Sequence, residues 1–319
     1  MKFKVVGIGE VLWDLLPSGS HLGGAPANFA YHTHALGASA SVVTRVGTDD
    51  FGLAIRHRFE EQGIAADTVQ VDDEVPTGTV TVALSPNGTP HYLIHENVAW
   101  DRLTITPEAL HVIREADAVG FGSLAQRSER SRTSIQKLVA ASPPGALRVF
   151  DINLRQNHFS GKTIEESLRL ANVLKLNDNE LSILAGLFGL AGSPRQQIER
   201  LARKFDLQLV ALTRGPAGSL LFQAGQWSDC LSVPIEIVDM VGAGDAFTAA
   251  LVLGLLHNLE LDEMNAFAAE VARHVCSCAG ATPPLPGKFA ERFAAHDFAR
   301  FMYQSITGMN PLTSQNDEN

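Results

Sequence analysis

A glycine-rich stretch near residue 240 contains the side chains best suited to chemistry. Residues 238–247 have the sequence VDMVGAGDAF, and the apolar run that begins at Ala246 predicts a buried helix. Residues 242–244 would lie at the amino end of that helix, where free N–H groups and the helix dipole favour an anion. Asp245 beside such an anion hole suits a general base that takes a proton from a hydroxyl while the amides hold a phosphoryl group.

The same residues also have a purely structural explanation. Aspartate is a common helix cap, and glycine is common in tight turns, so this stretch alone supports both interpretations equally. It is not a P-loop, because no Gly-Lys-Ser/Thr follows at the required spacing. Residues 7–12, GIGEVL, are not a dinucleotide fingerprint either, since Leu12 occupies the third glycine position.

The elements around this stretch alternate between strand-like and helix-like sequence. This alternation predicts an α/β fold with a mostly parallel central sheet and helices on both faces. The strand-like segments are residues 3–9, 40–47, 116–122, 147–153, 172–177 and 207–215, and two clear helix-like segments are 27–38 and 51–64.

One region departs from the alternation. Residues 75–98 hold two alternating stretches around Pro86-Asn87-Gly88, a strong hairpin signal without an intervening helix. We expect an antiparallel lid that projects from the α/β body, with residues 11–17 as a further strand. The polar residues 306–319 are expected to form a disordered tail after a single domain over 1–305.

Composition excludes several classes of function. The formal net charge of the 319 residues is −10 and no block of Lys and Arg stands out, which argues against binding to nucleic acid. No apolar run is long enough to span a membrane, and the amino-terminal residues lack a signal-peptide pattern. Cys230, Cys276 and Cys278 are expected to be free, buried thiols, and the expected location is cytoplasmic.

A second motif changes the weight of the two interpretations. GGAPANFA at 23–30, followed by Gly37 and Gly47, resembles the first signature of the PfkB (ribokinase-like) carbohydrate kinases, and DMVGAGD at 239–245 resembles the second. Met240 stands where threonine is usual. GTDDFG at 47–52 and DINLR at 151–155 are most similar to the fructokinase-like branch. The resemblance implies a three-layer ribokinase-like fold with a small β-sheet lid, and an ATP-dependent sugar kinase.

The resemblance also implies roles for individual residues. Asp245 would be the base toward a primary hydroxyl, the amides of Gly242, Ala243 and Gly244 the anion hole, and Arg155 a group that faces the phosphates. The residues expected to bind sugar hydroxyls are Asp14, Gly24 and Asn28.

The ATP site is implied by two further elements. KLNDNEL at 175–181 places Asn177 and Glu180 near phosphates bound to Mg²⁺, and Glu180 would act on the metal indirectly. The turn in residues 212–222 places Thr213, Gly215 and Gly218 beside the phosphates. Residues 235–245 and 275–284 would form the walls of the adenine pocket, and Asp239 matches the position at which some relatives hold a monovalent cation such as K⁺.

The acceptor is open at this point. Glu96 stands at or near a lid position where fructokinases usually carry arginine, which weakens fructose as the acceptor and disfavours an acidic sugar. A hexose such as fructose stays the leading acceptor. A nucleoside kinase on the same fold, a catalytically silent sugar-binding regulator and an enzyme that uses ADP as donor are the alternatives. An exposed lid with free edges favours a homodimer through the lid.

Overall fold

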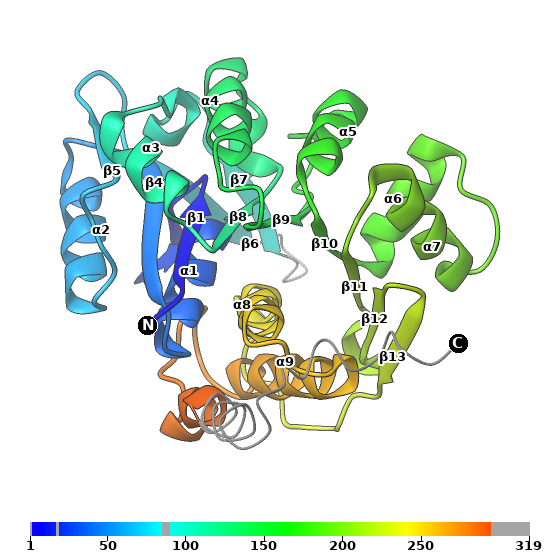
Figure 1. Cartoon of the computed structure of the whole chain (residues 1–319). Helices are drawn as coiled ribbons and strands as arrows, with labels where there is room; N and C mark the ends of the chain where they lie inside the picture. Colours follow the sequence, from blue (N-terminus) through cyan, green and yellow to red (C-terminus); the bar gives the residue numbers. More distant parts are fainter. Residues whose placement is uncertain (1, 17–18, 85–89, 295–319) are drawn as a thin grey trace.

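The computed structural model describes residues 2–16, 19–84 and 90–294. The expected turn at Pro86-Asn87-Gly88 and the expected tail at 306–319 lie outside the described residues. Within them the chain forms the α/β architecture that the alternating sequence predicts, with a large central sheet, helices on both of its faces and a second, smaller sheet (Figure 1).

The central sheet has nine strands within the described part of the chain. The strands from β11 to β5 run parallel, whereas β12 is antiparallel to β11 and β13 is antiparallel to β12. In spatial order they are β13 (Gln226–Cys230), β12 (Ser219–Gln223), β11 (Leu209–Thr213), β10 (Val173–Asn177), β9 (Leu147–Asp151), β8 (Ala118–Phe121), β1 (Lys4–Ile8), β4 (Ser39–Gly47) and β5 (Val69–Asp72).

Both faces of this sheet are buried because helices cover each of them, and successive strand residues point to opposite sides. Val5 packs into the cluster of buried residues that includes α8 and α9, whereas its neighbour Val6 packs into the cluster on the other face. The first layer contains α1 (Ala25–Ala35), α8 (Ala243–Leu256) and α9 (Leu261–Cys276), and the second contains α3 (Pro107–Arg114), α4 (Glu129–Ala140), α5 (Gly161–Leu170), α6 (Asp178–Phe188) and α7 (Pro194–Phe205).

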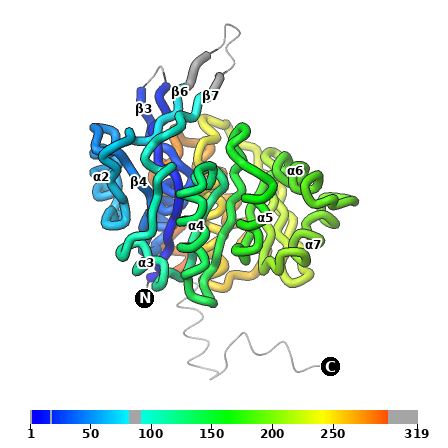
Figure 2. Tube along the Cα trace, turned by 90° about the horizontal axis from the view of Figure 1, so that it is seen from above, coloured from blue at the N-terminus to red at the C-terminus, as the bar shows by residue number. Residues whose placement is uncertain are grey.

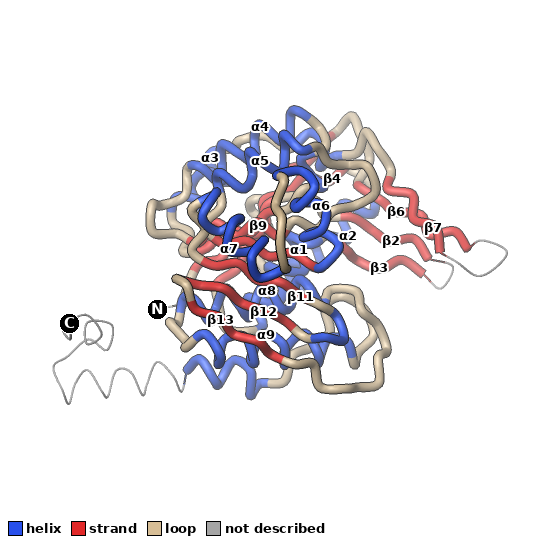
Figure 3. The backbone as a smooth tube through the Cα atoms, turned by 90° about the vertical axis from the view of Figure 1, so that its right-hand side faces the viewer, coloured by secondary structure: helices blue, strands red, loops and turns tan. Residues whose placement is uncertain are grey.

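The smaller sheet projects from one end of the body. Its strands lie in the order β3 (Gly19–Gly23), β2 (Leu12–Leu16), β6 (Gly78–Leu84) and β7 (Pro90–Ile94), and Figures 2 and 3 show it extending beyond the helical layers. Three of these strands fall within residues 11–17 and 75–98, the segments from which the sequence predicts a lid. The sequence did not predict β3, whose residues GSHLG lack a strand-like alternation. Helix α2 (Asp50–Glu61) flanks β4 beside this sheet.

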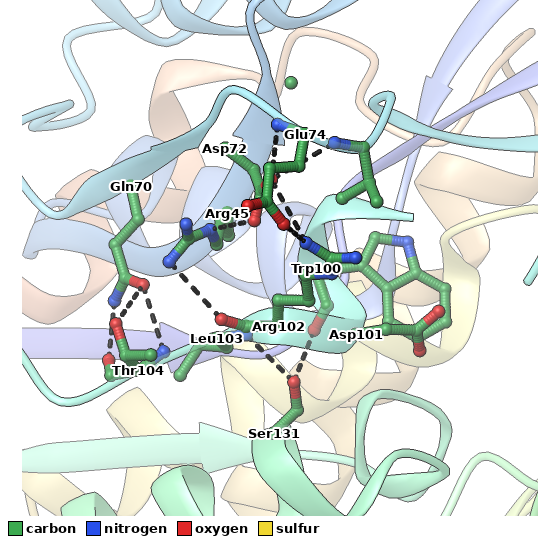
Figure 4. A network of polar contacts seen from close by, with 12 residues as sticks. Arg45, Gln70, Asp72, Glu74, Trp100, Asp101, Arg102, Leu103, Thr104 and Ser131 are labelled. Carbon is green, nitrogen blue, oxygen red and sulfur yellow. Dashed lines mark hydrogen bonds and ion pairs between the residues drawn. The ribbon is translucent and has the colours of Figure 1, made fainter. Parts of the chain in front are cut away.

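A network of polar contacts fixes the chain where it leaves the lid. After β7 the chain forms the short 3-10 helix η1 (Ala99–Arg102), and two further 3-10 turns are η2 (Leu124–Gln126) and η3 (Gly215–Ala217). Asp72 is buried at the end of β5 and pairs with Arg45 at 2.8 Å between Oδ2 and Nε (Figure 4). Arg102 contacts the same carboxylate, and Ser131 of α4 donates to the carbonyl of Trp100 over 2.7 Å. The base of the lid is therefore tied to both β5 and α4.

The three cysteines agree with the sequence-based expectation in one respect and differ from it in another. Cys230, Cys276 and Cys278 are free, as expected, but the expectation that they are buried is wrong, because each is partly exposed. They lie in the edge strand β13 and near the end of α9, where fewer elements cover the chain.

No helix among the described residues has the length and apolarity required to cross a membrane.

Candidate active site

The amino end of α8 is built by a glycine that no other residue replaces without strain. Gly242 precedes the helix with φ of 79°, and a Cβ at this position would lie 2.2 Å from the carbonyl oxygen of Ala281. No side chain caps this end, so N–H groups of the first turn are left for another acceptor. The helix begins at Ala243, earlier than the apolar run from Ala246 predicts. Asp245 therefore lies inside the first turn.

The carboxylate of Asp245 makes a contact that a helix cap does not need. Its Oδ2 accepts a hydrogen bond of 2.8 Å from Nδ2 of Asn28, a buried residue of α1 that is 217 positions away in the chain. Burial, and after it the nearby carboxylate of Asp151, raise the pKa of Asp245 to about 6 against the opposing effects of Asn28, Lys175 and Arg155. The interpretation of Asp245 as a helix cap is therefore not supported, and a proton acceptor that titrates near neutral pH fits the geometry.

A group of charged and polar side chains lies behind Asp245 and Gly244. Asp151 at the end of β9 pairs with Lys175 of β10 at 3.1 Å between Oδ1 and Nζ. Its other oxygen accepts a hydrogen bond of 2.9 Å from Thr248 Oγ1, which also lies 2.9 Å from the carbonyl oxygen of Gly244. Strands β9 and β10 and helix α8 meet at the centre of the molecule (Figure 1).

The residues expected to bind sugar hydroxyls come from β2 and the start of α1. Asp14 lies in β2 opposite His21 of β3, close to Gly23, where a Cβ would approach Asp14 Oδ2 to 2.7 Å. Burial raises the pKa of Asp14, and the charges of His21 and Arg155 oppose this shift. Gly24 precedes α1 with φ of 114°, so the first-signature glycines are demanded by backbone geometry as well as by any ligand.

Glu10, which the sequence analysis did not select, is a buried carboxyl beside these groups. It is 2% exposed, and its Oε2 atom has no hydrogen-bond partner. Burial, aided by the charge of Asp245, raises the pKa of Glu10 to about 7, although backbone hydrogen bonds and the charge of Arg155 oppose this rise. Arg155 itself is exposed, and its charge acts on Glu10, Asp14 and Asp245. The site therefore concentrates acidic groups around one arginine.

The residues expected near ATP phosphates lie at the carboxyl ends of β10 and β11. Asn177 Oδ1 accepts from the N–H of Glu180, and Glu180 Oε2 accepts from the N–H of Asn177 over 2.8 Å, which is a capping box at the start of α6. Glu180 Oε1 accepts from the N–H of Leu154 over 2.9 Å. Burial raises the pKa of Glu180, and both its oxygens already have backbone donors. An indirect electrostatic effect on a metal fits this residue better than direct coordination.

The turn between β11 and β12 contains the remaining phosphate-site candidates. Thr213 Oγ1 donates to the carbonyl of Leu176 over 3.3 Å. Gly215 and Gly218 have φ of 52° and 90°, and a Cβ at Gly218 would lie 1.9 Å from the carbonyl oxygen of Cys230. The close packing of β13 against this turn is therefore sufficient to explain Gly218.

Two segments that the sequence assigns to the adenine pocket lie side by side. The N–H groups of Val238 and Asp239 donate to the carbonyl of Cys276, and Asp239 Oδ2 accepts from the N–H of Gly280 over 3.1 Å. Asp239 Oδ1 accepts from Val241. The expected monovalent-cation residue thus bridges the two segments with its carboxylate. Exposed apolar side chains on the first segment are Ile235, Ile237, Val238, Met240 and Val241.

Glu96 lies apart from the pocket that contains Asp245. Asp245 lines a small hollow of about 20 Å³ together with Asp151 and Thr248. Glu96 lines a separate hollow of about 350 Å³, where its Oε1 lies 3.8 Å from His158 Nδ1 and its side chain is 67% exposed. Glu96 is therefore a largely exposed residue of a different hollow, whereas Asn28 and Asp245 lie in direct contact.

No cluster of three or more His, Cys, Asp and Glu side chains is arranged for a metal ion in the part of the chain that the structure describes. Magnesium that arrives with a nucleotide needs only one or two carboxylates, because phosphates and water supply its other ligands.

Comparison with known proteins identifies the family. The sequence profile of "pfkB family carbohydrate kinase" matches residues 19–288. The chain belongs to the PfkB family of carbohydrate kinases. It is 31% identical over 283 residues to a fructokinase of Klebsiella pneumoniae, covering 85% of this chain and 91% of that protein.

Solved structures show the same fold. An uncharacterized sugar kinase from Pyrococcus horikoshii in complex with ATP matches 91% of this chain and 99% of its own, with 29% identity and a TM-score of 0.76. A fructokinase from Vibrio cholerae O395 in a form with bound fructose, ADP and calcium ion matches 91% of this chain and 98% of its own, with 24% identity and a TM-score of 0.74. The ribokinase-like fold expected from the sequence is confirmed, and the protein is a carbohydrate kinase.

Sequence reasoning missed several polar residues of this kinase. Asp151 and Lys175 were seen only as parts of the segments DINLR and KLNDNEL, and Thr248 and Glu10 were not selected. A signal was available for Lys175 and Asp151, because a charged side chain in or at the end of a strand buried on both faces needs a partner. The identity of that partner depends on the register of β9 with β10, in which Lys175 lies opposite Asp151.

Proposed function

We propose that the protein transfers the γ-phosphoryl group of ATP to a primary hydroxyl of a small sugar, with a hexose such as fructose as the first candidate. The observation that carries the proposal is the position of Asp245 in the uncapped first turn of α8, in contact with Asn28 of the first signature. The name of the Klebsiella pneumoniae relative, a fructokinase, supports the choice of acceptor.

The proposed step uses this geometry directly. The acceptor hydroxyl gives its proton to Asp245, its oxygen forms a bond to the γ-phosphorus, and the bond from that phosphorus to the bridging oxygen breaks to release ADP. The amides of Gly242, Ala243 and Gly244 would hold the charge that develops on the transferring group. Asp14, Gly24 and Asn28 would orient the sugar, and Arg155 would face the phosphates from the opposite side.

ATP would lie over the carboxyl ends of β10 and β11. Thr213, Gly215 and Gly218 border the expected phosphate region, and residues 235–245 with 275–284 would enclose the adenine. Mg²⁺ bound to the phosphates would neutralise their charge, and Asn177 and Glu180 are the residues placed to act near it. The buried negative charge of Glu180 suits attraction of a hydrated cation.

Two further features belong to this proposal. Asp239 joins the two segments beside the anion hole, so K⁺ bound there would stabilise both segments. A comparison of activity in potassium salt and in tetramethylammonium salt tests this.

Tyr92 and Leu93 are 55% and 59% exposed on the edge strand β7, which supports a homodimer through the lid. Sedimentation of the protein and of Leu93→Asp tests the dimer, and a monomeric wild-type protein would contradict it.

The decisive experiment for the function is a panel of hexoses, pentoses, sugar acids and nucleosides with ATP and Mg²⁺, in which ADP release is measured. We expect turnover of a neutral hexose and, by ³¹P and ¹³C NMR, a phosphate ester on a primary carbon. Turnover of nucleosides alone would replace the sugar by a nucleoside, and activity with ADP alone would replace the donor. Sugar binding without phosphorylation by either donor would indicate a silent binding protein.

A further inference from the structure

The strongest unexplained feature of the molecule is the charged pair behind Asp245. The side chains of Asp151 and Lys175 are 13% and 9% exposed, and a buried pair that contributes only to stability is commonly replaceable by apolar residues. This pair instead lies next to the first turn of α8. A Cβ at Gly244 would lie 3.0 Å from Lys175 Nζ, so the ammonium group is packed against the backbone of the anion hole.

Thr248 connects the pair to the same backbone. It lies in α8 one turn after Gly244, and its hydroxyl is 2.9 Å from both Asp151 Oδ2 and the Gly244 carbonyl oxygen. A single hydroxyl hydrogen serves one of these acceptors at a time, or is shared between them. The first turn of α8 is therefore held from below by β9 and β10, while α1 holds Asp245 from the other side through Asn28.

The charges of the pair act on Asp245 in opposite directions. The negative charge of Asp151 opposes ionisation of Asp245, whereas the positive charge of Lys175 favours it. Burial alone would lower the pKa of Lys175, but the carboxylates of Asp151, Glu180 and Asp245 outweigh this effect, so the amine stays protonated. The other groups that face Asp245 are Asn28 from α1, Arg155 from the segment after β9 and Glu10 from the segment after β1.

We propose that Asp151, Lys175 and Thr248 form a positioning unit. The unit holds the first turn of α8, with Gly244 and Asp245, in place and balances the charge around the base. Asp151 keeps Lys175 in place and offsets its charge, so that Asp245 remains a base near neutral pH and is not turned into a weakly basic, permanently ionised group. The hydroxyl of Thr248 connects Asp151 to the backbone of Gly244. The inference rests on the proposed role of Asp245 in phosphoryl transfer.

The electrostatic part is tested by the pH dependence of kcat/KM in three proteins. Asp151→Asn keeps the shape of the side chain but leaves the charge of Lys175 unopposed, so the acidic limb should move to lower pH by about one unit or more. In the double variant Asp151→Asn/Lys175→Met the pair is again neutral, and the limb should return toward the wild-type position. General damage to the fold does not reverse when a second substitution is added. An unmoved limb in Asp151→Asn, or no return in the double variant, would overturn the proposal.

A direct titration separates this inference from the proposed function. In the ligand-free protein with ¹³C-labelled aspartate, the carboxyl resonance that disappears in Asp245→Asn should titrate at lower pH in Asp151→Asn than in the wild type, and recover in the double variant. This readout needs no substrate. Absence of turnover with every acceptor would refute the proposed function, whereas an unchanged titration of Asp245 would refute the charge balance.

The role of Thr248 in positioning the first turn of α8 is tested by Thr248→Val, with Thr33→Val as the matched control. Thr33 is also a buried helical threonine, but its hydroxyl donates to the Ala30 carbonyl within α1. We expect kcat to fall about fivefold to tenfold in Thr248→Val, the rate equivalent of one hydrogen bond, while the Kd for ATP and the acidic limb change little. Equal kcat values for the two variants would remove Thr248 from the unit.

Discussion

Replacement of Asp245 by asparagine should abolish most of the activity and at the same time stabilise the protein. Asparagine has nearly the same shape, and its Oδ1 atom still accepts the hydrogen bond that Asn28 donates to Asp245 over 2.8 Å. The substitution therefore removes the proton acceptor while the contact between α1 and α8 persists. Loss of a positioned general base lowers the rate by about 10²–10⁴.

The stability effect follows from the pKa of Asp245. Burial raises this pKa from 3.8 to about 6, and each unit corresponds to about 1.36 kcal/mol, so ionised Asp245 disfavours the folded state by at most about 3 kcal/mol. Because the folded pKa lies above the unfolded value, this cost is absent below pH 4, grows as the pH rises to about 6 and is complete above that. Asp245→Asn should thus raise the free energy of unfolding at pH 7.5 but hardly at pH 4.

Two measurements check this pair of expectations. Steady-state kinetics should show a kcat lower by about 10² or more with a Kd for ATP close to that of the wild type, which calorimetry measures without turnover. Urea unfolding at both pH values gives the stability difference. A variant that retains wild-type kcat would exclude Asp245 as the base. An inactive variant whose free energy of unfolding equals that of the wild type at both pH values would show that ionised Asp245 does not destabilise the native protein.

Three further substitutions test other parts of the structure. Glu96→Arg should leave the acceptor preference unchanged, because Glu96 lines a hollow separate from that of Asp245 and its side chain is 67% exposed; a shift from neutral toward acidic sugars would instead place Glu96 in the acceptor site. Gly218→Ala should lower the free energy of unfolding by about 2 kcal/mol or more, because its Cβ would collide with a backbone carbonyl, whereas Gly145→Ala, with open space around it, should match the wild type in thermal unfolding. Asp72→Asn should cost about 3–5 kcal/mol at pH 7, because it removes the carboxylate that neutralises Arg45. Burial would raise the pKa of Asp72, but backbone N–H groups and Arg45 outweigh it and hold the pKa below 3.8, so this difference should shrink in acid as the carboxyl protonates; an undiminished difference would exclude the ion pair as its cause.

Much of the fold is encoded locally and was predictable for that reason. Apolar runs such as Leu209–Thr213 predict strands buried on both faces, and the glycines at 24 and 242 are required by backbone conformations that other residues rarely adopt. Strand β3 was missed because GSHLG has no alternating pattern; its pairing with β2 stabilises it. The capping box at the start of α6 is also a local pattern, although the sequence alone assigned its residues to phosphate binding.

The sequence by itself determined the fold class, the family and the position of the candidate base, because these depend on short patterns and on the backbone they require. Only the tertiary structure decided which groups face Asp245. The contact with Asn28, the pair of Asp151 with Lys175 and the buried carboxyl of Glu10 come from segments far apart in the chain. Their effect on Asp245 depends on distance and desolvation, and both are set by the packing of α1, β9, β10 and α8 together.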